Sequence, residues 1–585
     1  MVWRPDPIRV DGLRPTRWVR PPLAVSRWVG SQWGGALGNY LRRYDYGGLL
    51  VALVFLCWSL TPSLLPRPWY VQSMESGIAL VMGYAVGAGI SWIVRTRLAL
   101  RPSLQTRRHA WWSLGVLAAV TAPTMMFLHA RWQREVRTLV DAPQPSTASY
   151  FRVLGVALLI GFVVVGLARG LRDAVALVAR RLPRFLPRGL ATVLAAALVA
   201  VVFVLLLNGL LMRVLLGVAN AAFRSADEGN KPGVVRTHDP LRSGSEASLV
   251  SWDSLGKEGR AFVAGGPSET ELTNFGGRPA MDPIRVFSGL RSAGSLRAEA
   301  ALAVRELDRT GAFSRSVLAV GTTTGRGWVD PQLANPLEYM YNGDTAIVAI
   351  QYSYLPSWLS FLVDQTRARQ AGQELFDQVY ERWAQLPVDH RPKLLVFGES
   401  LGAYGSQAAF SGAADLRNRT DGALWVGPPY DSSLTRQFAK ERAPGSPERL
   451  PTFEHGRTVR YSANAENTPT EGWRSPRVLV LQHASDPVVW WSWNLVLHKP
   501  AWLGERRGPD VMSQMHWYPI VSFWQISGDL LFSAGATPGH GHRYDEESAR
   551  GWTYVAPPPG WTAADTDHLV AVMRQLAEES ARAKG

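Results

Sequence analysis

The sequence is poor in cysteine and holds only Cys57 among its 585 residues. A chain with one thiol has no internal disulfide, so each domain must be held together by its own hydrophobic core. His540 and His542 could form a metal pair with Asp545, but no further histidine, cysteine or carboxylate cluster has the regular spacing of a zinc site. We therefore expect neither a metal ion nor a cofactor.

We also expect no removable signal peptide, because the first long apolar run begins only at Gly47. Several stretches long enough to cross a bilayer follow, and we expect five spans in a helical domain at residues 47–215. Pro62, inside the first span, predicts a kink or an end of the helix there. The approximate spans are Gly47–Leu65, Ser76–Val94, Trp111–Ala130, Arg152–Ala168 and Leu190–Met212.

The formal net charge of +15 does not indicate a nucleic-acid partner, because the arginines follow the membrane topology rather than one binding face. They are dense in the tail 1–46, after the second span and after the fourth, and sparse in the first and third loops. The positive-inside rule places the arginine-rich segments in the cytoplasm. With five spans, we expect a multi-pass cell-membrane protein whose C-terminal domain is extracytoplasmic.

The second half of the chain has the pattern of a soluble domain. Residues 216–280 are rich in glycine, serine and proline and predict a linker and lead-in segment. From residue 281 to 585, apolar strands alternate with helices, which favours a mostly parallel sheet covered on both faces. The expected strands are Pro283–Phe287, Ser316–Gly321, Thr345–Gln351, Lys393–Phe397, Ala423–Val426 and Arg477–Gln482, and the clearest helices are Leu296–Asp308 and Gln373–Leu386.

One motif points to catalysis. Gly398-Glu399-Ser400-Leu401-Gly402 follows the apolar strand at 393–397 and leads into a run of small residues. A serine between two glycines at a strand-to-helix turn is typical of a nucleophile, because the strained turn exposes its hydroxyl. A plain strand-to-helix turn is the alternative interpretation.

A serine nucleophile needs a base and an acid, which in this arrangement follow it in the chain. Asp486 lies in a turn directly after the strand at 477–482 and is the predicted acid, with Asp431 as the alternative. His540, between two glycines, is the predicted base, and His542 and His568 are alternatives.

An oxyanion hole would use the backbone N–H of Leu401 and one from the loop after the strand at 316–321. Thr322 and Thr323 are the candidates in that loop, and an ordinary polar turn is the alternative.

A tryptophan-rich stretch separates the predicted acid from the predicted base. Amphipathic rings suit an acyl-binding cap or a surface at the membrane interface, and they equally suit a plain hydrophobic core. The stretch includes Trp490, Trp491, Trp493, Trp502, Trp517 and Trp524.

Residues 260–575 look like an α/β-hydrolase. Together with the preceding spans and the segment Leu-Thr-Pro-Ser-Leu-Leu-Pro-Arg-Pro-Trp at 60–69, the chain resembles the actinobacterial membrane-linked α/β-hydrolase family. The resemblance implies a hydrolase fold with serine, acid and histidine but no particular substrate. The 54 residues between Asp486 and His540 exceed the usual gap and leave room for an inserted cap.

These observations predict a membrane-tethered serine hydrolase of the esterase or lipase type. Its expected substrate is an ester of an envelope lipid or an acylated glycan, cleaved by Ser400, His540 and Asp486. An acyltransferase using the same acyl-enzyme and a noncatalytic membrane scaffold are the competing hypotheses.

Overall fold

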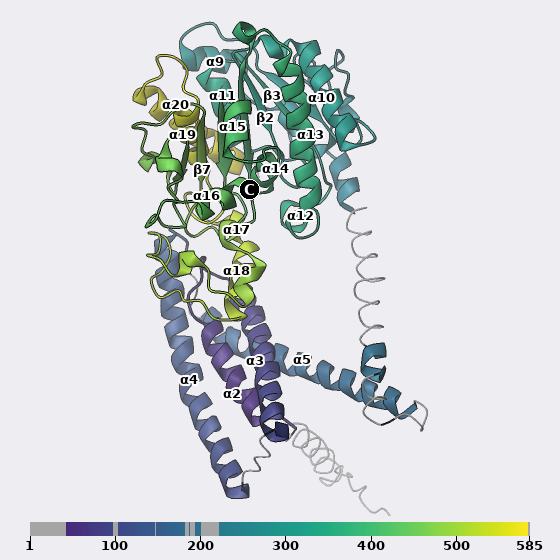
Figure 1. The fold of residues 1–585 in the computed structure, drawn as a ribbon, viewed down its shortest axis with the longest axis vertical. Helices are drawn as coiled ribbons and strands as arrows, with labels where there is room; N and C mark the ends of the chain where they lie inside the picture. Colours follow the sequence, from purple (N-terminus) through teal and green to yellow (C-terminus); the bar gives the residue numbers. More distant parts are fainter. Residues whose placement is uncertain are drawn as a thin grey trace, which may run out of the picture.

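The computed structural model describes residues 43–97, 103–144, 146, 148–181, 187, 194–199 and 222–582. An α/β region forms one end of the molecule, and helices of the N-terminal region extend from it (Figure 1). The sheet has seven strands, all parallel, in the order β1-β3-β2-β4-β5-β7-β6. The strands are β1 Ile284–Ser288, β2 Val317–Gly321, β3 Thr345–Ile350, β4 Lys393–Glu399, β5 Gly422–Val426, β6 Val459–Ser462 and β7 Arg477–Leu481.

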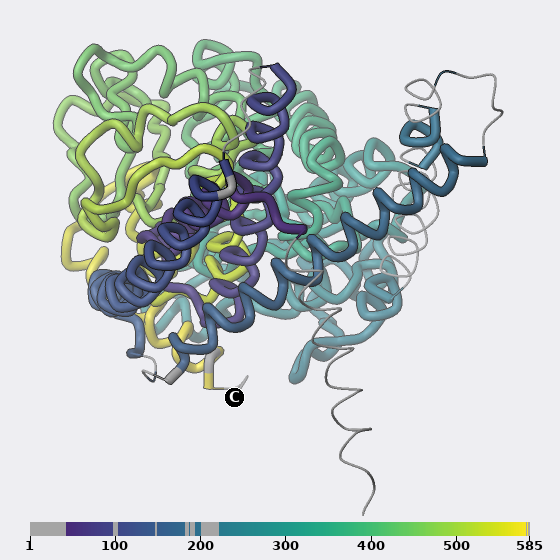
Figure 2. The backbone as a smooth tube through the Cα atoms, turned by 90° about the horizontal axis from the view of Figure 1, so that it is seen from below, coloured from purple at the N-terminus to yellow at the C-terminus, as the bar shows by residue number. Residues whose placement is uncertain are grey.

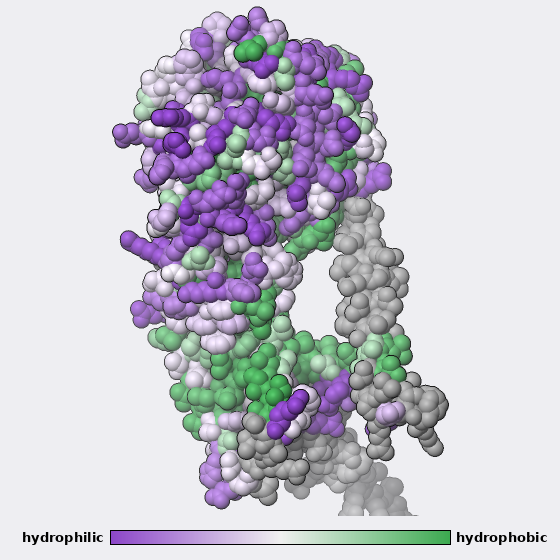
Figure 3. Space-filling model, viewed as in Figure 1, coloured by the Kyte–Doolittle hydropathy of each residue, from purple (hydrophilic) through white to green (hydrophobic). Residues whose placement is uncertain are grey.

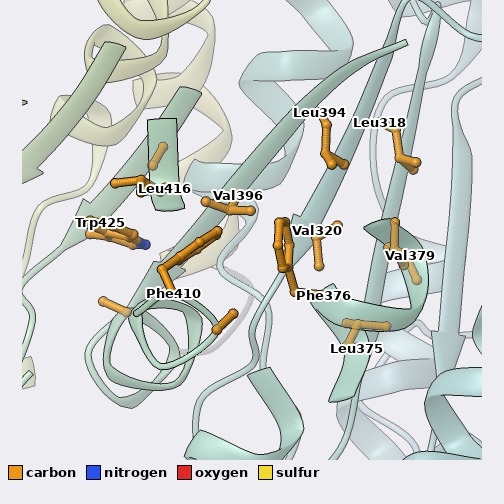
Figure 4. Packing of buried hydrophobic residues seen from close by; sticks show 14 of the residues in the cluster. Leu318, Val320, Leu375, Phe376, Val379, Leu394, Val396, Phe410, Leu416 and Trp425 are labelled. Carbon is orange, nitrogen blue, oxygen red and sulfur yellow. The ribbon is translucent and has the colours of Figure 1, made fainter. Parts of the chain in front are cut away.

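The central strands are apolar on both faces because helices cover both sides of the sheet. Figure 4 shows part of one layer, where side chains of β2 and β4 face Leu375, Phe376 and Val379 of α13. That layer contains α10 Leu296–Thr310, α13 Gln365–Ala384, α14 Leu401–Gln407, α15 Ala413–Arg419 and α16 Ser433–Lys440. The other contains α8 Gly256–Ala264, α9 Glu269–Gly276, α11 Pro331–Met340, α19 Glu546–Val555 and α20 Ala563–Arg582.

The predicted mostly parallel α/β architecture is therefore confirmed, and the six expected strands match β1 to β5 and β7 to within one or two residues at each end. β6 was not expected. Within the segment 216–280, α8 and α9 are regular helices whose Phe262, Val263 and Leu272 pack into the core of the α/β region.

The long segment between β7 and α19 holds the helices that connect the two regions. α17 Pro487–Trp490 and α18 Val521–Leu530 lie in it, and α18 packs on helices of the N-terminal region. α12 Ser357–Val363 lies at the same end of the α/β region (Figure 1).

Among its described residues, the N-terminal region has three helices long and apolar enough to cross a membrane. They lie in α3 Trp69–Arg97, α4 Leu104–Leu139 and α5 Ala148–Arg181. Viewed from below, α4 and α5 run in different directions beneath the α/β region (Figure 2). Hydrophobic surface gathers on this helical region, whereas the α/β region is largely hydrophilic (Figure 3).

The predicted first span, Gly47–Leu65, is wrong in its extent. The helix α2 covers only Tyr46–Ser59, 14 residues, and the chain from Leu60 to Pro68 is not helical. Three prolines in those nine residues remove backbone donors and end the helix early. Of the predicted fifth span, Leu190–Met212, only 194–199 lie within the described residues, as do only 43–46 of the tail 1–46.

Candidate active site

Ser400 occupies a strained turn between β4 and α14. Its φ of 53° and ψ of −123° lie in a region that residues with a side chain rarely adopt. The flanking glycines are needed because a Cβ on Gly398 would lie 2.3 Å from the carbonyl carbon of Gly402. The Ser400 N–H donates to the carbonyl oxygen of Val426 at 2.9 Å, which fixes the turn against the end of β5. The structure thus has the local geometry that the motif predicts.

Asp486 lies after β7 and is fully buried. Its Oδ1 accepts the Val488 N–H at 2.8 Å and so caps α17. Its Oδ2 accepts the Tyr544 hydroxyl at 2.8 Å and lies 2.7 Å from Nδ1 of His542. A carboxylate at this distance holds the proton of the imidazole on Nδ1 and leaves Nε2 as the basic nitrogen.

The His542 ring lies beside the Ser400 turn. A Cβ built on Gly427, which directly follows β5, would come within 2.5 Å of the ring. Nε2 is buried, has no hydrogen-bond partner among the described residues, and lies 3.9 Å from Oε1 of Glu399, the residue before the serine. A buried basic nitrogen without a partner at this place suits a proton acceptor.

His540 is not the partner of Asp486. Its Nδ1 lies 3.5 Å from Asp510 and its Nε2 lies 3.7 Å from Asp141, in the loop between α4 and α5. Burial would raise the pKa of Asp510, but His540 and the Ser485 hydroxyl beside it hold that pKa below its ordinary value. In the structure Asp486 therefore pairs with His542, the alternative candidate, and not with His540.

The other two alternatives lie elsewhere. Asp431 is half exposed and pairs with Arg436 at 3.5 Å. His568, on α20, stacks on Phe275 of α9 with ring centroids 4.6 Å apart. Neither contacts the histidine or the aspartate described above.

The loop after β2 touches the start of α14. A Cβ on Gly402 would lie 2.3 Å from the carbonyl oxygen of Thr322, so the two segments are in direct contact. The Thr322 N–H donates to Phe397 at 3.0 Å and is therefore occupied. The amides of Leu401 and Thr323 donate to no other described atom, and the Thr323 hydroxyl fixes its loop by donating to Ile350 at 2.8 Å. These two amides are the remaining candidates for an oxyanion hole.

Two partly buried carboxyl groups, Glu399 and Asp330, lie together here, and Glu399 is the one 3.9 Å from Nε2 of His542. Burial raises the pKa of Asp330 to about 6 and that of Glu399 well above its ordinary value, and the two groups share a hydrogen bond. The raised pKa favours the neutral form of Glu399, which reduces the negative charge that faces Nε2 of His542. The described residues contain no group of three or more His, Cys, Asp or Glu side chains arranged to hold a metal ion.

Tyr544, which donates to Asp486, is itself held by His483 and Glu547. The His483 ring stacks on Tyr544 with centroids 4.0 Å apart, and its Nε2 lies 2.7 Å from Glu547. Burial alone would lower the pKa of His483, but the hydrogen bond and charge of Glu547 raise the pKa above its ordinary value. Tyr544 and His483 carry no sequence motif, so the structure was needed to find these contacts.

The pairing of His483 with Glu547 predicts a pH-dependent contribution to stability. Since the folded pKa of His483 is raised above 6.5, this contribution is complete below pH 6.5 and is lost as the pH rises through the folded value. Glu547→Gln should lower the free energy of unfolding by about 1.5–3 kcal/mol at pH 6 and by clearly less at pH 9. Denaturant unfolding in detergent measures both.

Glu546→Gln is the matched control, because Glu546 pairs with an arginine, Arg574, rather than with a histidine. An equal loss for Glu547→Gln at both pH values would mean that His483 does not titrate as stated.

A parallel sheet with a strained serine after its central strand, and an acid and a histidine held after later strands, defines the α/β-hydrolase class. Comparison with family models agrees with the geometry. The model of an alpha/beta-hydrolase family matches residues 284–569, and the model of the N-terminus of the same family matches residues 60–267. The chain belongs to this α/β-hydrolase family, whose fold indicates a hydrolase-type activity. No curated protein and no solved structure gives a significant match.

Proposed function

We propose that this chain is a membrane-anchored serine hydrolase that cleaves carboxylic esters. The observation that carries the proposal is the 2.7 Å pairing of His542 with buried Asp486 beside the strained Ser400 turn. Ser400 is the nucleophile, His542 the general base and Asp486 the residue that orients it. His542 takes the role that the sequence alone assigns to His540.

The proposed reaction has two half-reactions. Ser400 Oγ attacks the ester carbonyl and gives its proton to Nε2 of His542, while Asp486 stabilises the resulting imidazolium. The amides of Leu401 and Thr323 hold the negative oxygen of the tetrahedral intermediate. The carbon–oxygen bond to the alcohol breaks, and the alcohol leaves with the proton from His542. A water molecule then releases the acyl group by the same steps.

The proposed substrate class is a lipid ester. Apolar side chains are exposed on α12 and on the 3-10 turn Trp493–Val496, with Trp358 54%, Trp493 69% and Leu497 67% exposed. Trp491 connects the two segments, because its ring lies 5.4 Å from that of Phe361 on α12 and 5.5 Å from that of Trp493. We call Trp358, Leu362, Val363, Trp493 and Leu497 the apolar rim.

The apolar rim lies at the end of the α/β region that faces the helical region, where Figure 3 shows hydrophobic surface near α12. Exposed tryptophan and aliphatic side chains next to membrane-spanning helices suit the interface of a bilayer. They support a site that receives its ester from the membrane. With the arginine distribution described above, we place the catalytic domain on the extracytoplasmic side.

A cavity of about 230 Å³ lies beside α17, between α16 and the ends of β6 and β7. Its lining combines aromatic and cationic side chains with the carboxyl group of Glu448 and the amide of Gln482, which suits a sugar on the alcohol part of an envelope ester. The lining includes Tyr430, Tyr461, Trp490, Arg436, Lys440 and Arg442.

Covalent labelling tests the proposed function. The full-length protein in detergent is treated with an alkyl fluorophosphonate, which phosphonylates activated serines, and the labelled peptide is identified by mass spectrometry. We expect one labelled site, Ser400, and no labelling after heat denaturation. Folded protein that stays unlabelled, or is labelled at another serine, would contradict the proposal.

A further inference from the structure

The segment Leu60–Pro68, between α2 and α3, is built into the hydrolase region. Ser63 Oγ donates to Oδ2 of Asp529 on α18, and the Leu64 N–H donates to the same oxygen at 3.0 Å. Nε of Arg67 lies 3.6 Å from Oδ1 of Asp529, and the same guanidinium pairs with Glu75 on α3. The Asp529 carboxylate thus binds three residues, Ser63, Leu64 and Arg67, that precede it by more than 460 positions in the sequence.

This junction is deeply buried. The side chains of Arg67 and Asp529 are 1% and 0% exposed, and Gly528 leaves no room for a side chain because its Cβ would overlap Glu75. A buried ion pair contributes little net stability, because desolvation offsets the attraction between its charges. The buried pair instead fixes one relative position of the segment Leu60–Pro68 and α18, because only that position gives both charges their partners.

Gln525 extends the junction by one turn of α18. Its side-chain amide reaches the carbonyl oxygens of Trp58 at 3.2 Å and of Thr61 at 3.2 Å. Trp58 also stacks on Tyr518, just before α18, with centroids 5.0 Å apart. α18 is therefore held at Gln525 and Asp529 by the end of α2 and by the segment that links α2 to α3.

The end of α18 leads directly to the loop of the candidate base. Ser533, three residues after α18, donates its hydroxyl to the Leu530 carbonyl at 3.0 Å. The Ser533 carbonyl in turn accepts the N–H of His542 at 3.1 Å. Gly541 packs on Ser533 and on Leu65, where a Cβ would meet the Leu65 side chain at 3.3 Å. The loop therefore rests on the linking segment both directly and through α18.

Two further contacts join the helical region to the site. Asp141, between α4 and α5, lies 3.7 Å from Nε2 of His540 in the same loop. Leu64 and Leu65 share a buried hydrophobic cluster with Leu401, the neighbour of Ser400.

We propose that the helical region positions the catalytic histidine, with Arg67, Asp529 and Leu65 as positioning residues that act through the loop 539–543. The proposal rests on the proposed function, because it assumes that His542 is the base. It assigns to the N-terminal region a role in the reaction itself, in addition to anchoring. Catalytic groups must be held within a fraction of an ångström, and a misplacement of about 1 Å costs roughly 100-fold in rate.

The test uses full-length protein in detergent and compares wild type with Asp529→Asn and Leu65→Ala. Asp529→Asn removes the charge that holds Arg67, and Leu65→Ala removes the direct contact with Gly541 while leaving the ion pair intact. We expect the rate constant for fluorophosphonate labelling, and kcat for a short soluble ester, to fall about 30- to 100-fold in Asp529→Asn and about tenfold in Leu65→Ala. KM should change less than about twofold, because neither residue contacts the substrate.

Arg131→Ala is the matched control in the helical region, because Arg131 is exposed and, among the described residues, pairs with Glu135 on its own helix. It should keep the wild-type rate. Thermal melting shows whether each variant is folded. If Asp529→Asn does not fold, the labelling rate of Leu65→Ala alone tests the positioning role. Folded variants with wild-type labelling rates would overturn the positioning role while leaving the serine hydrolase intact, whereas an unlabelled wild type would overturn the proposed function.

Discussion

His542→Ala is expected to lower kcat for ester hydrolysis about 10⁶-fold, Ser400→Ala to do the same, and the double variant to lose no more than either alone. The two residues transfer one proton in the same step, so removing either abolishes the whole step. The 2.7 Å bond between His542 and Asp486 and the free Nε2 beside the Ser400 turn are the geometric basis. Initial rates with a p-nitrophenyl ester measure the effect.

His540→Ala is the matched control, since it removes a histidine two residues away in the same loop. We expect its rate to stay within about tenfold of the wild type, because no atom that handles the reacting proton is lost. A large loss in His540→Ala with an active His542→Ala would reverse the two assignments. Additive losses in the double variant would show that Ser400 and His542 do not act together.

Asp486→Asn is expected to lower kcat about 10⁴-fold with little change in KM. An amide in place of the carboxylate no longer fixes the proton on Nδ1 of His542 and no longer stabilises the imidazolium that forms during the reaction. The side chain is nearly isosteric and still caps α17 through its remaining oxygen, so the fold should be kept. Steady-state kinetics and thermal melting separate the two effects.

Tyr544→Phe provides the comparison for this variant, because it removes only the hydroxyl that donates to Asp486 at 2.8 Å. Its rate should fall by no more than about tenfold, since the carboxylate and its charge remain. An Asp486→Asn enzyme as active as Tyr544→Phe would mean that another group orients the histidine.

The sheet and the serine turn could be predicted because their determinants are local. The strand at 393–397 and the glycines around Ser400 follow one another in the chain, and close packing of Gly398 on Gly402 needs no distant partner. The strand at 477–482 likewise points to Asp486, which the structure pairs with His542. β6 was missed because Arg460 and the short run Val459–Ser462 give little apolar signal for a strand at the edge of the sheet.

The choice between His540 and His542 could not be made from the sequence. Both follow a glycine in the same loop, and the side chain that faces Asp486 is set by the turn at Gly541, with a φ of 56°, and by the bond of His542 to Ser533. In the same way, Arg67 looks like an isolated charge between two prolines, because its partner Asp529 is hundreds of residues away. Tertiary contacts of this kind leave no periodicity or spacing to recognise.

The buried junction between Leu60–Pro68 and α18 makes the N-terminal region and the hydrolase domain depend on each other. A hydrolase domain fused to an unrelated anchor would expose Asp529 and leave α18 without its partners, so exchange of whole domains is disfavoured. The N-terminal region and the hydrolase domain should instead be inherited as a matched pair, and changes on one side of the junction should be accompanied by compensating changes on the other.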